Sequence, residues 1–524
     1  MSSDLSVVSA HPAGEIISSS TESSVSTVVL PDSVAVQTPG GRVHVEWDPH
    51  APVTPMGQLV FFAQFLETAG LFDPWILECP LCYTSPNAPK VRDVLGTHFL
   101  SVLSGHFRYA HVSALRHDTV NPPLLGMGKV VSEDSVRRAF EDEPVEKFEL
   151  WQRHHLQLSY QPLLFEPWIL DVDTTVKTLY GRQEGAEVGF NPHKKGRPSH
   201  VYHTYFMGSA RLALDVEVQP GKQTAALHSQ PGLWRLVDEL PKDARPWLVR
   251  GDCNFGNESL MAQAEARNQK YLFKLRLTRK PKDLIRQMEQ TGNWTDAGQG
   301  WQGREGSLRL QGWSRPRRVI ILRRKLAQAP GNPTLAQGLQ LLLNWTGLFP
   351  VQGPIYEYAV LVTSLQEEIL SIAQLYRDRA DVENNFDELK NQWGWGGFVT
   401  KDLGRCQIAA RTIALIYNWW SLFVHLADPS KRREAITSRP LLLSSVARRT
   451  THAGQVSVII TPAHAEAGRI QEMLHRVTTF LTGLMESAEQ LTSAERWRRI
   501  LSKIFEKELG GRPLRGPSMV LDSS

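Results

Sequence analysis

The sequence predicts an α/β protein with a mixed sheet at its centre and helical regions on both sides of it along the chain. Two observations lead to this fold class. Between residues 167 and 277, short apolar runs alternate with segments of helical periodicity, which is typical of a mixed sheet flanked by helices. Before and after this stretch, apolar residues recur mainly at helical spacing. The chain of 524 residues is long enough for several hydrophobic cores.

The N-terminal part is predicted to be a flexible segment followed by helices. Residues 1–45 are rich in Ser and Thr and lack the basic start and continuous apolar run of a signal peptide. We expect them to form a disordered lead-in. Residues 46–160 form a predicted helical region, with helices expected at 56–70, 90–104, 132–140 and 145–159.

Residues 161–279 are predicted to form the first part of the sheet core, and 361–428 the second part. In the first part the elements follow in the order β-β-β-α-β-α-β. The strands are expected at 167–176, 201–207, 212–218, 246–250 and 271–277, and the helices at 233–240 and 258–267. In the second part, helices are predicted from 369 through 390, with 376–390 on a single helix, and over 406–426.

Two further regions complete the predicted organisation. Residues 280–360 form a β-rich insertion, with strands expected at 307–311, 317–323 and 356–363. Residues 429–524 form a C-terminal helical region, which is a candidate for dimerisation. Its clearest helices are expected at 463–486 and 493–509.

The charge is segregated along the chain, although the net charge is only +4. Cations gather at 274–282, at 315–325 and at Lys194, Lys195 and Arg197. Segregated positive charge of this kind suits a polyanionic partner such as DNA. Four cysteines argue against a disulfide scaffold. The best apolar run, 412–427, is shorter than the roughly 20 residues that a membrane span needs, so we expect a soluble, intracellular protein.

The segment 376–390, YRDRADVENNFDELK, carries an unusual stripe of side chains. On a helix at about 100° per residue, its members fall at about 0°, 300°, 340° and 320°. Tyrosine, cation, carboxylate and cation therefore share one narrow face, which suits a metal and a phosphate chain together. The members are Tyr376, Arg379, Glu383 and Lys390.

Two upstream acids follow apolar runs of the kind found in buried strands. Asp173 ends the run in WILDVD, and Asp252 follows WLVRG. Ligand sites of open α/β sheets lie outside the carboxyl ends of strands, so these acids and Glu383 are able to converge. Three carboxylates without Cys or His suit Mg²⁺ or Mn²⁺, and two such ions support phosphoryl transfer. The sequence has no P-loop, so no nucleotide cofactor is expected.

The set Asp173, Asp252 and Glu383, with the spacing Y-(2)-R-(3)-E-(6)-K around the Glu, resembles the DDE transposases of bacterial insertion sequences. The segments 171–197 and 250–256 resemble one subgroup of them. The resemblance covers most of the chain from about residue 45. It implies an RNase H-like core with the insertion before the Glu, two Mg²⁺ ions that Mn²⁺ can replace, and a bacterial, cytoplasmic protein associated with the nucleoid.

The resemblance also implies partners and roles. The partners are double-stranded DNA, as element ends and as target, and a second copy of the chain in a synaptic dimer, without a membrane. The helical region 46–160 would bind the element ends. Asp173, Asp252 and Glu383 would hold the metals and carry catalysis. The DNA backbone would be contacted by Tyr376, Arg379 and Lys390, and by Lys194, Lys195 and Arg197.

Alternatives stay open at this point. Asp171 shares a strand face with Asp173, and Asp387 lies beside Glu383 on the helix stripe. The D-T-T pattern of the family favours Asp173, and its signature spacing favours Glu383. In function, the rivals are a nuclease of the same fold that does not transpose, and an inactive, DNA-binding repressor derived from a transposase. All three carboxylates are present, which counts against the repressor.

Overall fold

The computed structural model describes residues 33–516 except 142, 193, 327–355, 396 and 488–490, and the side chains of residues 381–383 are outside the description as well. The chain divides into two compact units, residues 1–51 and 52–524. In the first unit, strands β1 (Ser33–Thr38) and β2 (Gly41–Glu46) form an antiparallel hairpin. Residues 1–32, most of the predicted lead-in, lie outside the described residues.

A ten-stranded mixed sheet runs through the described part of the second unit. Its strands are β4 (Ile169–Thr178), β5 (Glu187–Val188), β6 (Pro198–Met207), β7 (Leu212–Pro220), β8 (Leu248–Gly251), β9 (Tyr271–Lys274), β10 (Thr295–Asp296), β11 (Trp301–Leu308), β12 (Arg317–Lys325) and β13 (Tyr356–Thr363). The order is β10-β11-β12-β13-β9-β8-β4-β6-β5, and β7 also pairs with β6. Strand β8 is parallel to both its neighbours, β4 and β9, while the other pairs are antiparallel.

The succession of the core elements confirms the prediction of a mixed α/β fold. After β4, β6 and β7 come helix α8 (Gln230–Asp238), β8, helix α9 (Glu258–Ala266) and β9, with the short helix α7 (Ala225–His228) before α8. All four residues of β8 are buried, as expected for a central parallel strand covered on both faces. Helix α9 begins where the Asn257 side chain accepts a hydrogen bond from the Leu260 N–H.

The segment predicted as a β-rich insertion continues the same sheet. Strand β13 pairs with β9, and β12, β11 and β10 follow outward, so the insertion adds strands to the edge of the core. The predicted strands at 317–323 and 356–363 correspond to β12 and β13, and the one at 307–311 overlaps the end of β11. Helix α10 (Arg279–Thr291) opens the segment.

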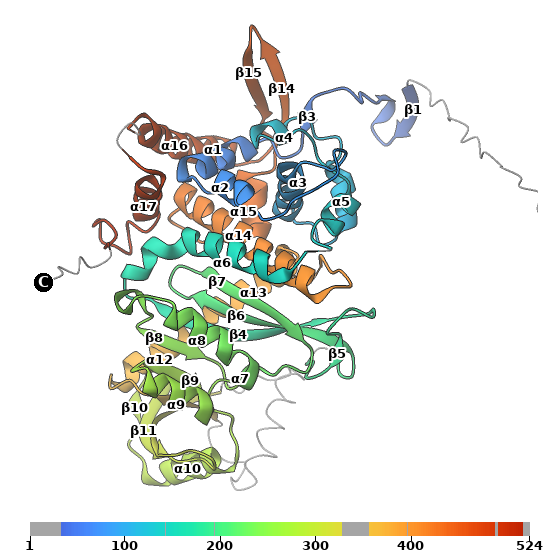
Figure 1. The fold of residues 1–524 in the computed structure, drawn as a ribbon. Helices are drawn as coiled ribbons and strands as arrows, with labels where there is room; N and C mark the ends of the chain where they lie inside the picture. The colour runs from blue at the N-terminus through green and yellow to red at the C-terminus, as the bar shows by residue number, and fades with distance from the viewer. Residues whose placement is uncertain are drawn as a thin grey trace, which may run out of the picture. The chain divides into compact units, whose positions relative to one another are not determined.

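The helical regions pack largely against one another. They comprise α1 (Leu59–Ala69), α2 (Phe72–Leu77), α3 (Val91–Leu103), α4 (Asn121–Leu124), α5 (Glu133–Arg138) and α6 (Val145–Tyr160), then α12 (Ile369–Arg377), α13 (Ala380–Gln392), α14 (Leu403–Ala427), α15 (Ala435–Leu442), α16 (Ala467–Glu486) and α17 (Ser493–Ile504). Short 3₁₀ helices lie at Tyr109–Leu115, Gln161–Phe165 and Lys242–Ala244. Helices α6 and α14 lie between the sheet and the other N- and C-terminal helices (Figure 1).

Helix α14 closes one edge of the sheet. Two of its side-chain amides bond the outer backbone of the edge strand β7. Gln407 accepts from the Val218 N–H and donates to the Val216 carbonyl, at 2.6 Å for the latter, and Asn418 makes the same two-way contact with Ala213 at 2.9 and 2.8 Å. The helix is buried along almost its whole length. None of the helices that the structure describes is long and apolar enough to cross a lipid bilayer.

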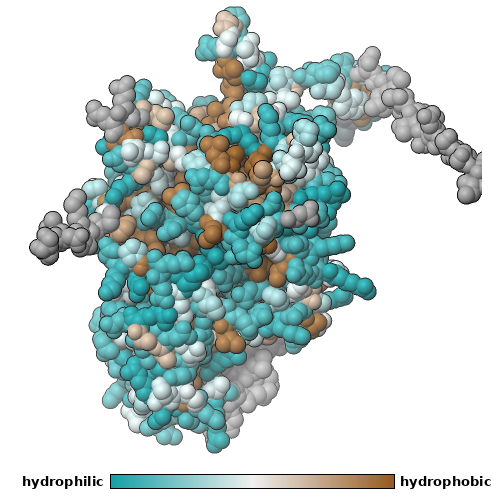
Figure 2. All heavy atoms as spheres, viewed as in Figure 1, coloured by the Kyte–Doolittle hydropathy of each residue, from teal (hydrophilic) through white to brown (hydrophobic). Residues whose placement is uncertain are grey.

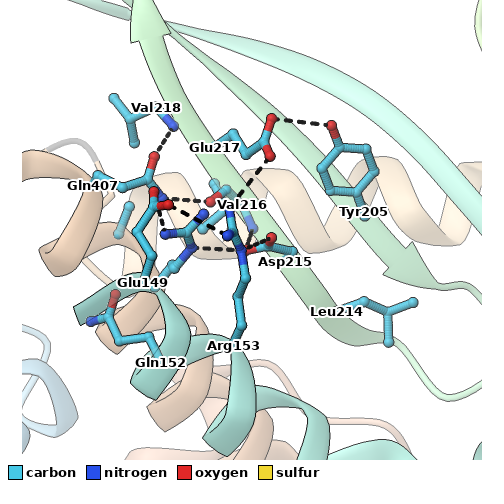
Figure 3. A network of polar contacts seen from close by, with 12 residues as sticks. Glu149, Gln152, Arg153, Tyr205, Leu214, Asp215, Val216, Glu217, Val218 and Gln407 are labelled. Atoms are coloured by element: carbon cyan, nitrogen blue, oxygen red, sulfur yellow. Dashed lines mark hydrogen bonds and ion pairs between the residues drawn. The ribbon is translucent and has the colours of Figure 1, made fainter. Parts of the chain in front are cut away.

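A buried network of charges fixes β7 to three helices (Figure 3). Asp215 on β7 accepts hydrogen bonds from Arg411 at 2.8 Å, Arg153 at 3.1 Å and Arg235 at 2.8 Å. These arginines come from α14, α6 and α8, so one carboxylate joins the sheet to all three helices. Although burial raises the pKa of Asp215, the surrounding guanidinium groups lower it to about 2.

The C-terminal region contains a β-hairpin that the sequence prediction of mostly helical structure did not include. Strands β14 (Val446–His452) and β15 (Gln455–Thr461) are antiparallel, and β14 also pairs with β3 (Val53–Thr54). Ala453 and Gly454 turn the chain at positive φ, 50° and 80°, as in two-residue hairpin turns. Residues 446–461 are rich in Val, Ile and Thr, and these β-branched residues favour strands.

Candidate active site

Two neighbouring strands bring Asp173 and Asp252 together. The register of the parallel pair β4–β8 sets Asp171 beside Arg250 and Val172 beside Gly251. Asp173 and Asp252 are the next residues of the two segments, directly after the last paired positions. The two acids that sequence analysis chose from distant segments therefore end the same parallel strand pair.

The turn after β8 orients the Asp252 carboxylate. One of its oxygens accepts a hydrogen bond from the Asn254 N–H at 2.8 Å, and the other accepts from the Asn254 side chain at 3.1 Å. Arg276 in turn donates to the Asn254 side-chain oxygen. Asp252 is half-buried, and its described contacts come from this turn. The carboxylate is thus held in place while it remains accessible to solvent.

Asp171, the rival of Asp173, is engaged elsewhere. Its side chain is about 1% exposed and accepts two hydrogen bonds from Arg250, at 2.5 and 2.7 Å. Burial raises the pKa of the Asp171 carboxyl, an effect that Arg250 opposes. Asp171 therefore holds the buried Arg250 guanidinium in place. This contact favours Asp173 over Asp171 as the site residue.

Arg250 also contacts the point at which the helix predicted over 376–390 is interrupted. In a continuous helix the Leu375 carbonyl would accept the Arg379 N–H. Here that carbonyl accepts a hydrogen bond from Arg250 Nη1, and the Arg379 N–H bonds Tyr376 at 3.2 Å instead. Helix α12 therefore ends at Arg377 and α13 begins at Ala380. The prediction of one helix was wrong at this point, and Tyr376 stands on a different helix from Lys390.

The break places Arg379 against Asp173. Arg379 Nη2 donates to Asp173 Oδ2 at 2.5 Å, and the Arg379 side chain is 5% exposed. The other oxygen of Asp173 accepts the Thr174 N–H at 2.6 Å. Glu383 follows Arg379 by about one turn in α13, so its backbone lies near this pair. The side chain of Glu383 lies outside the described residues.

The remaining members of the stripe lie at the two ends of the helix pair. Tyr376 is half-buried and packs against the apolar cluster under α12. Lys390, in the last turn of α13, lines a cavity of about 180 Å³ between α13 and β4. Asp387 is exposed and accepts a hydrogen bond from Asn391 at 2.7 Å. Its position between Glu383 and Lys390 on α13 keeps it an alternative to Glu383.

The sequence analysis missed Lys177, which lines the same cavity as Lys390. Lys177 follows Asp173 by four residues on β4, and the period of two places both on one face of the strand. That spacing was the available signal. The spacing alone does not predict that Lys177 lies near Lys390, because that depends on how α13 packs over β4.

The predicted basic cluster lies further along, in the loop between β5 and β6. Lys194 Nζ is 2.6 Å from the Tyr180 hydroxyl, and the Arg197 guanidinium lies 5.9 Å from the centre of that ring. Tyr180 itself is 68% exposed. Lys195 lies in the same exposed loop. The structure thus gathers the cluster around an aromatic ring beyond the end of β4, apart from the Asp173–Asp252 pair.

The residues present fit the expected metal. Asp173 and Asp252 offer only oxygen, the donor that Mg²⁺ and Mn²⁺ prefer. Thr174 and Asn254 orient the two carboxylates independently of any ion. Among the side chains that the structure describes, no group of three or more His, Cys, Asp or Glu is able to hold a metal. Glu383, the third expected ligand, is not among those side chains.

Comparisons with known proteins show the family of the chain. Residues 89–480 match the model of the family described as transposase DDE domain group 1. No match was found among curated proteins. One similar solved structure is a chain of the piggyBac transposase synaptic complex with hairpin DNA, determined by cryo-electron microscopy. It is 11% identical with a TM-score of 0.34, over 90% of this chain and 88% of that one. By its family match, this chain belongs to the DDE-domain transposases.

Proposed function

We propose that this protein is the transposase of a bacterial insertion sequence, acting on DNA in the cytoplasm. The observation that carries the proposal is the meeting of Asp173, Asp252 and the first turn of α13 beside the β4–β8 pair. The strand order β7-β6-β4-β8-β9, antiparallel up to β4 and parallel after it, supports an RNase H-like core. The Y-(2)-R-(3)-E-(6)-K spacing supports the insertion-sequence group.

In this proposal Asp173, Asp252 and Glu383 hold two Mg²⁺ ions, which Mn²⁺ can replace. When bound, such ions activate the attacking oxygen and stabilise the leaving oxygen in phosphoryl transfer. A water molecule attacks the phosphodiester at the element end and frees a 3′-OH, which then attacks the opposite strand or the target DNA. The protein itself contributes positioning and charge.

The proposed DNA interface follows β4 away from the acids. Arg379 adds positive charge beside Asp173, and Lys390 lies at the other end of α13. The loop around Tyr180 offers an exposed ring with cations over it, which suits stacking on a base and contact with phosphates. The helical region 46–160 is proposed to bind the element ends. The full set of proposed DNA contacts is Tyr376, Arg379, Lys390, Lys194, Lys195 and Arg197.

We assign the dimer contact of a synaptic complex to the C-terminal region, 429–524. A hollow of about 540 Å³ lies at the base of the β14–β15 hairpin, lined in part by Phe61, Ile460, Ile470 and Leu474. Apolar side chains gather around that base, whereas the face over the sheet is mostly hydrophilic (Figure 2). An apolar surface of this kind is suited to a protein partner.

The test is Mg²⁺-dependent cleavage of duplex DNA taken from the sequences that flank this reading frame. We expect Asp252→Asn and Glu383→Gln to abolish cleavage without loss of DNA binding. Asp387→Asn is the matched comparison on α13, and it should cleave as the wild type does. Cleavage by Asp252→Asn at the wild-type rate would refute the assignment of Asp252 as a catalytic residue.

The same assay separates the rival functions. A transposase yields products in which the freed 3′-OH is joined to a second DNA. A nuclease of the same fold yields cut ends alone, and a repressor binds the ends without cutting them. The oriented Asp173 and Asp252 carboxylates favour the catalytic readings over the repressor.

A further inference from the structure

A cationic cavity adjoins the acids on the same face of β4. It has a volume of about 180 Å³ and lies between β4, the strand β6 and the end of α13. Its wall includes Thr175 and Lys177 from β4, Tyr202 from β6, and Lys390 and Asn391 from α13. At about 30 Å³ per water molecule the cavity has room for roughly six waters, which is enough for a phosphate group with part of its hydration.

Lys177 is buried in this wall without a counter-charge. It is 9% exposed, and its ammonium donates one hydrogen bond, to the Gly397 carbonyl at 2.6 Å. No described carboxylate forms an ion pair with Lys177 or with Lys390. The cross-strand neighbour of Lys177 is His200, whose Nε2 contacts the Glu184 carbonyl and whose own pKa is lowered by burial. His200 therefore brings no negative charge to the Lys177 ammonium.

This arrangement is costly for the free protein. A buried charge without a partner of opposite sign loses hydration and gains little in return. Burial accordingly lowers the pKa of Lys177 to about 8, with a small opposing effect from Cys406. An anion in the cavity would offset this cost, because it would accept the remaining donors of Lys177 and lie close to Lys390 as well.

We propose that the cavity is a subsite for a backbone phosphate of the DNA strand that enters the Asp173–Asp252 site, with Lys177 and Lys390 as its two cations. The inference rests on the proposed function and adds a residue to it. Along β4, Lys177 lies four residues from Asp173, or about 13 Å at 3.3 Å per residue. DNA rises about 3.4 Å per nucleotide of one strand, so the bound phosphate lies within about four nucleotides of the cleaved bond.

The alternative is that Lys177 only fastens the chain after α13 through the Gly397 carbonyl. The two roles predict opposite results for Lys177→Met. A phosphate subsite predicts weaker DNA binding in a free protein that is no less stable, because a buried charge is replaced by an apolar chain of similar length. A fastening role predicts a less stable protein whose DNA binding depends on salt as before.

The experiment measures binding of the full chain to end-containing duplex, in EDTA so that no cleavage occurs, from 50 to 200 mM salt. For Lys177→Met we expect the slope of log affinity against log salt to become shallower by about 0.9, the value for one lost phosphate contact. Lys177→Arg should restore the slope. Lys270→Met, whose exposed side chain pairs with Glu367 ahead of β9, is the control and should match the wild type.

A second measurement identifies the phosphate. Single phosphates of the duplex are replaced by uncharged methylphosphonates, one position at a time. For the wild type, a methylphosphonate at one position within about four nucleotides of the cleaved bond should lower the affinity. For Lys177→Met, a methylphosphonate at that position should have no effect, while the effects at all other positions stay as in the wild type. A profile of Lys177→Met identical to that of the wild type overturns the subsite.

The outcomes separate the two proposals. Wild-type protein that never cuts the duplex with Mg²⁺, but shows a methylphosphonate-sensitive position whose effect is lost in Lys177→Met, refutes the proposed function and keeps the subsite. Wild-type cleavage combined with an unchanged salt slope and a lower unfolding temperature for Lys177→Met refutes the subsite alone.

Discussion

The buried pair Asp171–Arg250 allows stability and activity to be separated by mutation. Arg250 is 2% exposed and makes two bonds to Asp171 and one to the Leu375 carbonyl. Removal of one charge leaves the other buried without a partner, which costs about 3–5 kcal/mol. We therefore expect Asp171→Asn and Arg250→Met each to lower the free energy of unfolding by that amount. Glu472→Gln, in an exposed pair on α16, should change it by less than about 1 kcal/mol.

The double variant Asp171→Leu/Arg250→Met should behave differently. With both charges gone, an apolar pair fills the space, and much of the stability should return, because buried ion pairs are often no better than apolar packing. The double variant should nevertheless fail to cleave DNA. Without Arg250, the Leu375 carbonyl is free to accept the Arg379 N–H, so α12 continues into α13 and Arg379 is carried away from Asp173.

Urea unfolding followed by circular dichroism gives the free energies, and Mg²⁺-dependent cleavage of end-containing duplex gives the activity. The reasoning is refuted if Asp171→Asn costs no more than Glu472→Gln. It is also refuted if the double variant is as unstable as the single ones, or if it cuts DNA at the wild-type rate.

Three further outcomes are expected. The pKa of Asp215 is lowered to about 2, so its contribution to stability is complete above its ordinary pKa of 3.8 and is lost as pH falls towards 2. The lowered pKa contributes about 2 kcal/mol to the free energy of unfolding. Between pH 5 and pH 2, the free energy of unfolding should fall less steeply for Asp215→Asn than for the wild type. Gln407→Leu leaves the Val218 N–H on β7 unpaired and should cost about 1–3 kcal/mol, whereas the exposed Gln366→Leu should cost almost nothing; equal midpoints in urea would contradict this. Wild-type affinity for DNA should fall at least about tenfold between 50 and 200 mM salt, and a flat response would count against the proposed phosphate contacts.

The strands and their acids could be predicted because the signals are local. Asp173 and Asp252 each follow an apolar run, and the run itself indicates a buried strand. The parallel register that sets them side by side was open in the sequence, since it depends on how β4 and β8 pair. The choice between Asp171 and Asp173 was equally open, because both share one face of β4. The structure favours Asp173 through the contact of Asp171 with Arg250.

The break between α12 and α13 was hidden for a different reason. Every residue from 369 to 390 is compatible with a helix, and the interruption comes from Arg250, more than a hundred positions upstream. Local periodicity does not report such a contact. Lys177 was missed in a similar way, because a lysine on a strand acquires meaning only when α13 covers it. The β14–β15 hairpin is rich in β-branched residues, which favour strands, and this local signal lay in a segment read as helical.

The contacts of α14 with β7 determine at which edge the sheet is able to accept further strands. Gln407 and Asn418 offer β7 the amide groups that a neighbouring strand would otherwise present, so a helix takes the place of an eleventh strand at that end. On the other side of the core, β9 pairs with β13, and the chain adds β12, β11 and β10 beyond it. Variants of this architecture with longer or shorter insertions can therefore gain or lose whole strands on the β9 side, while the acids on β4 and β8 keep their places.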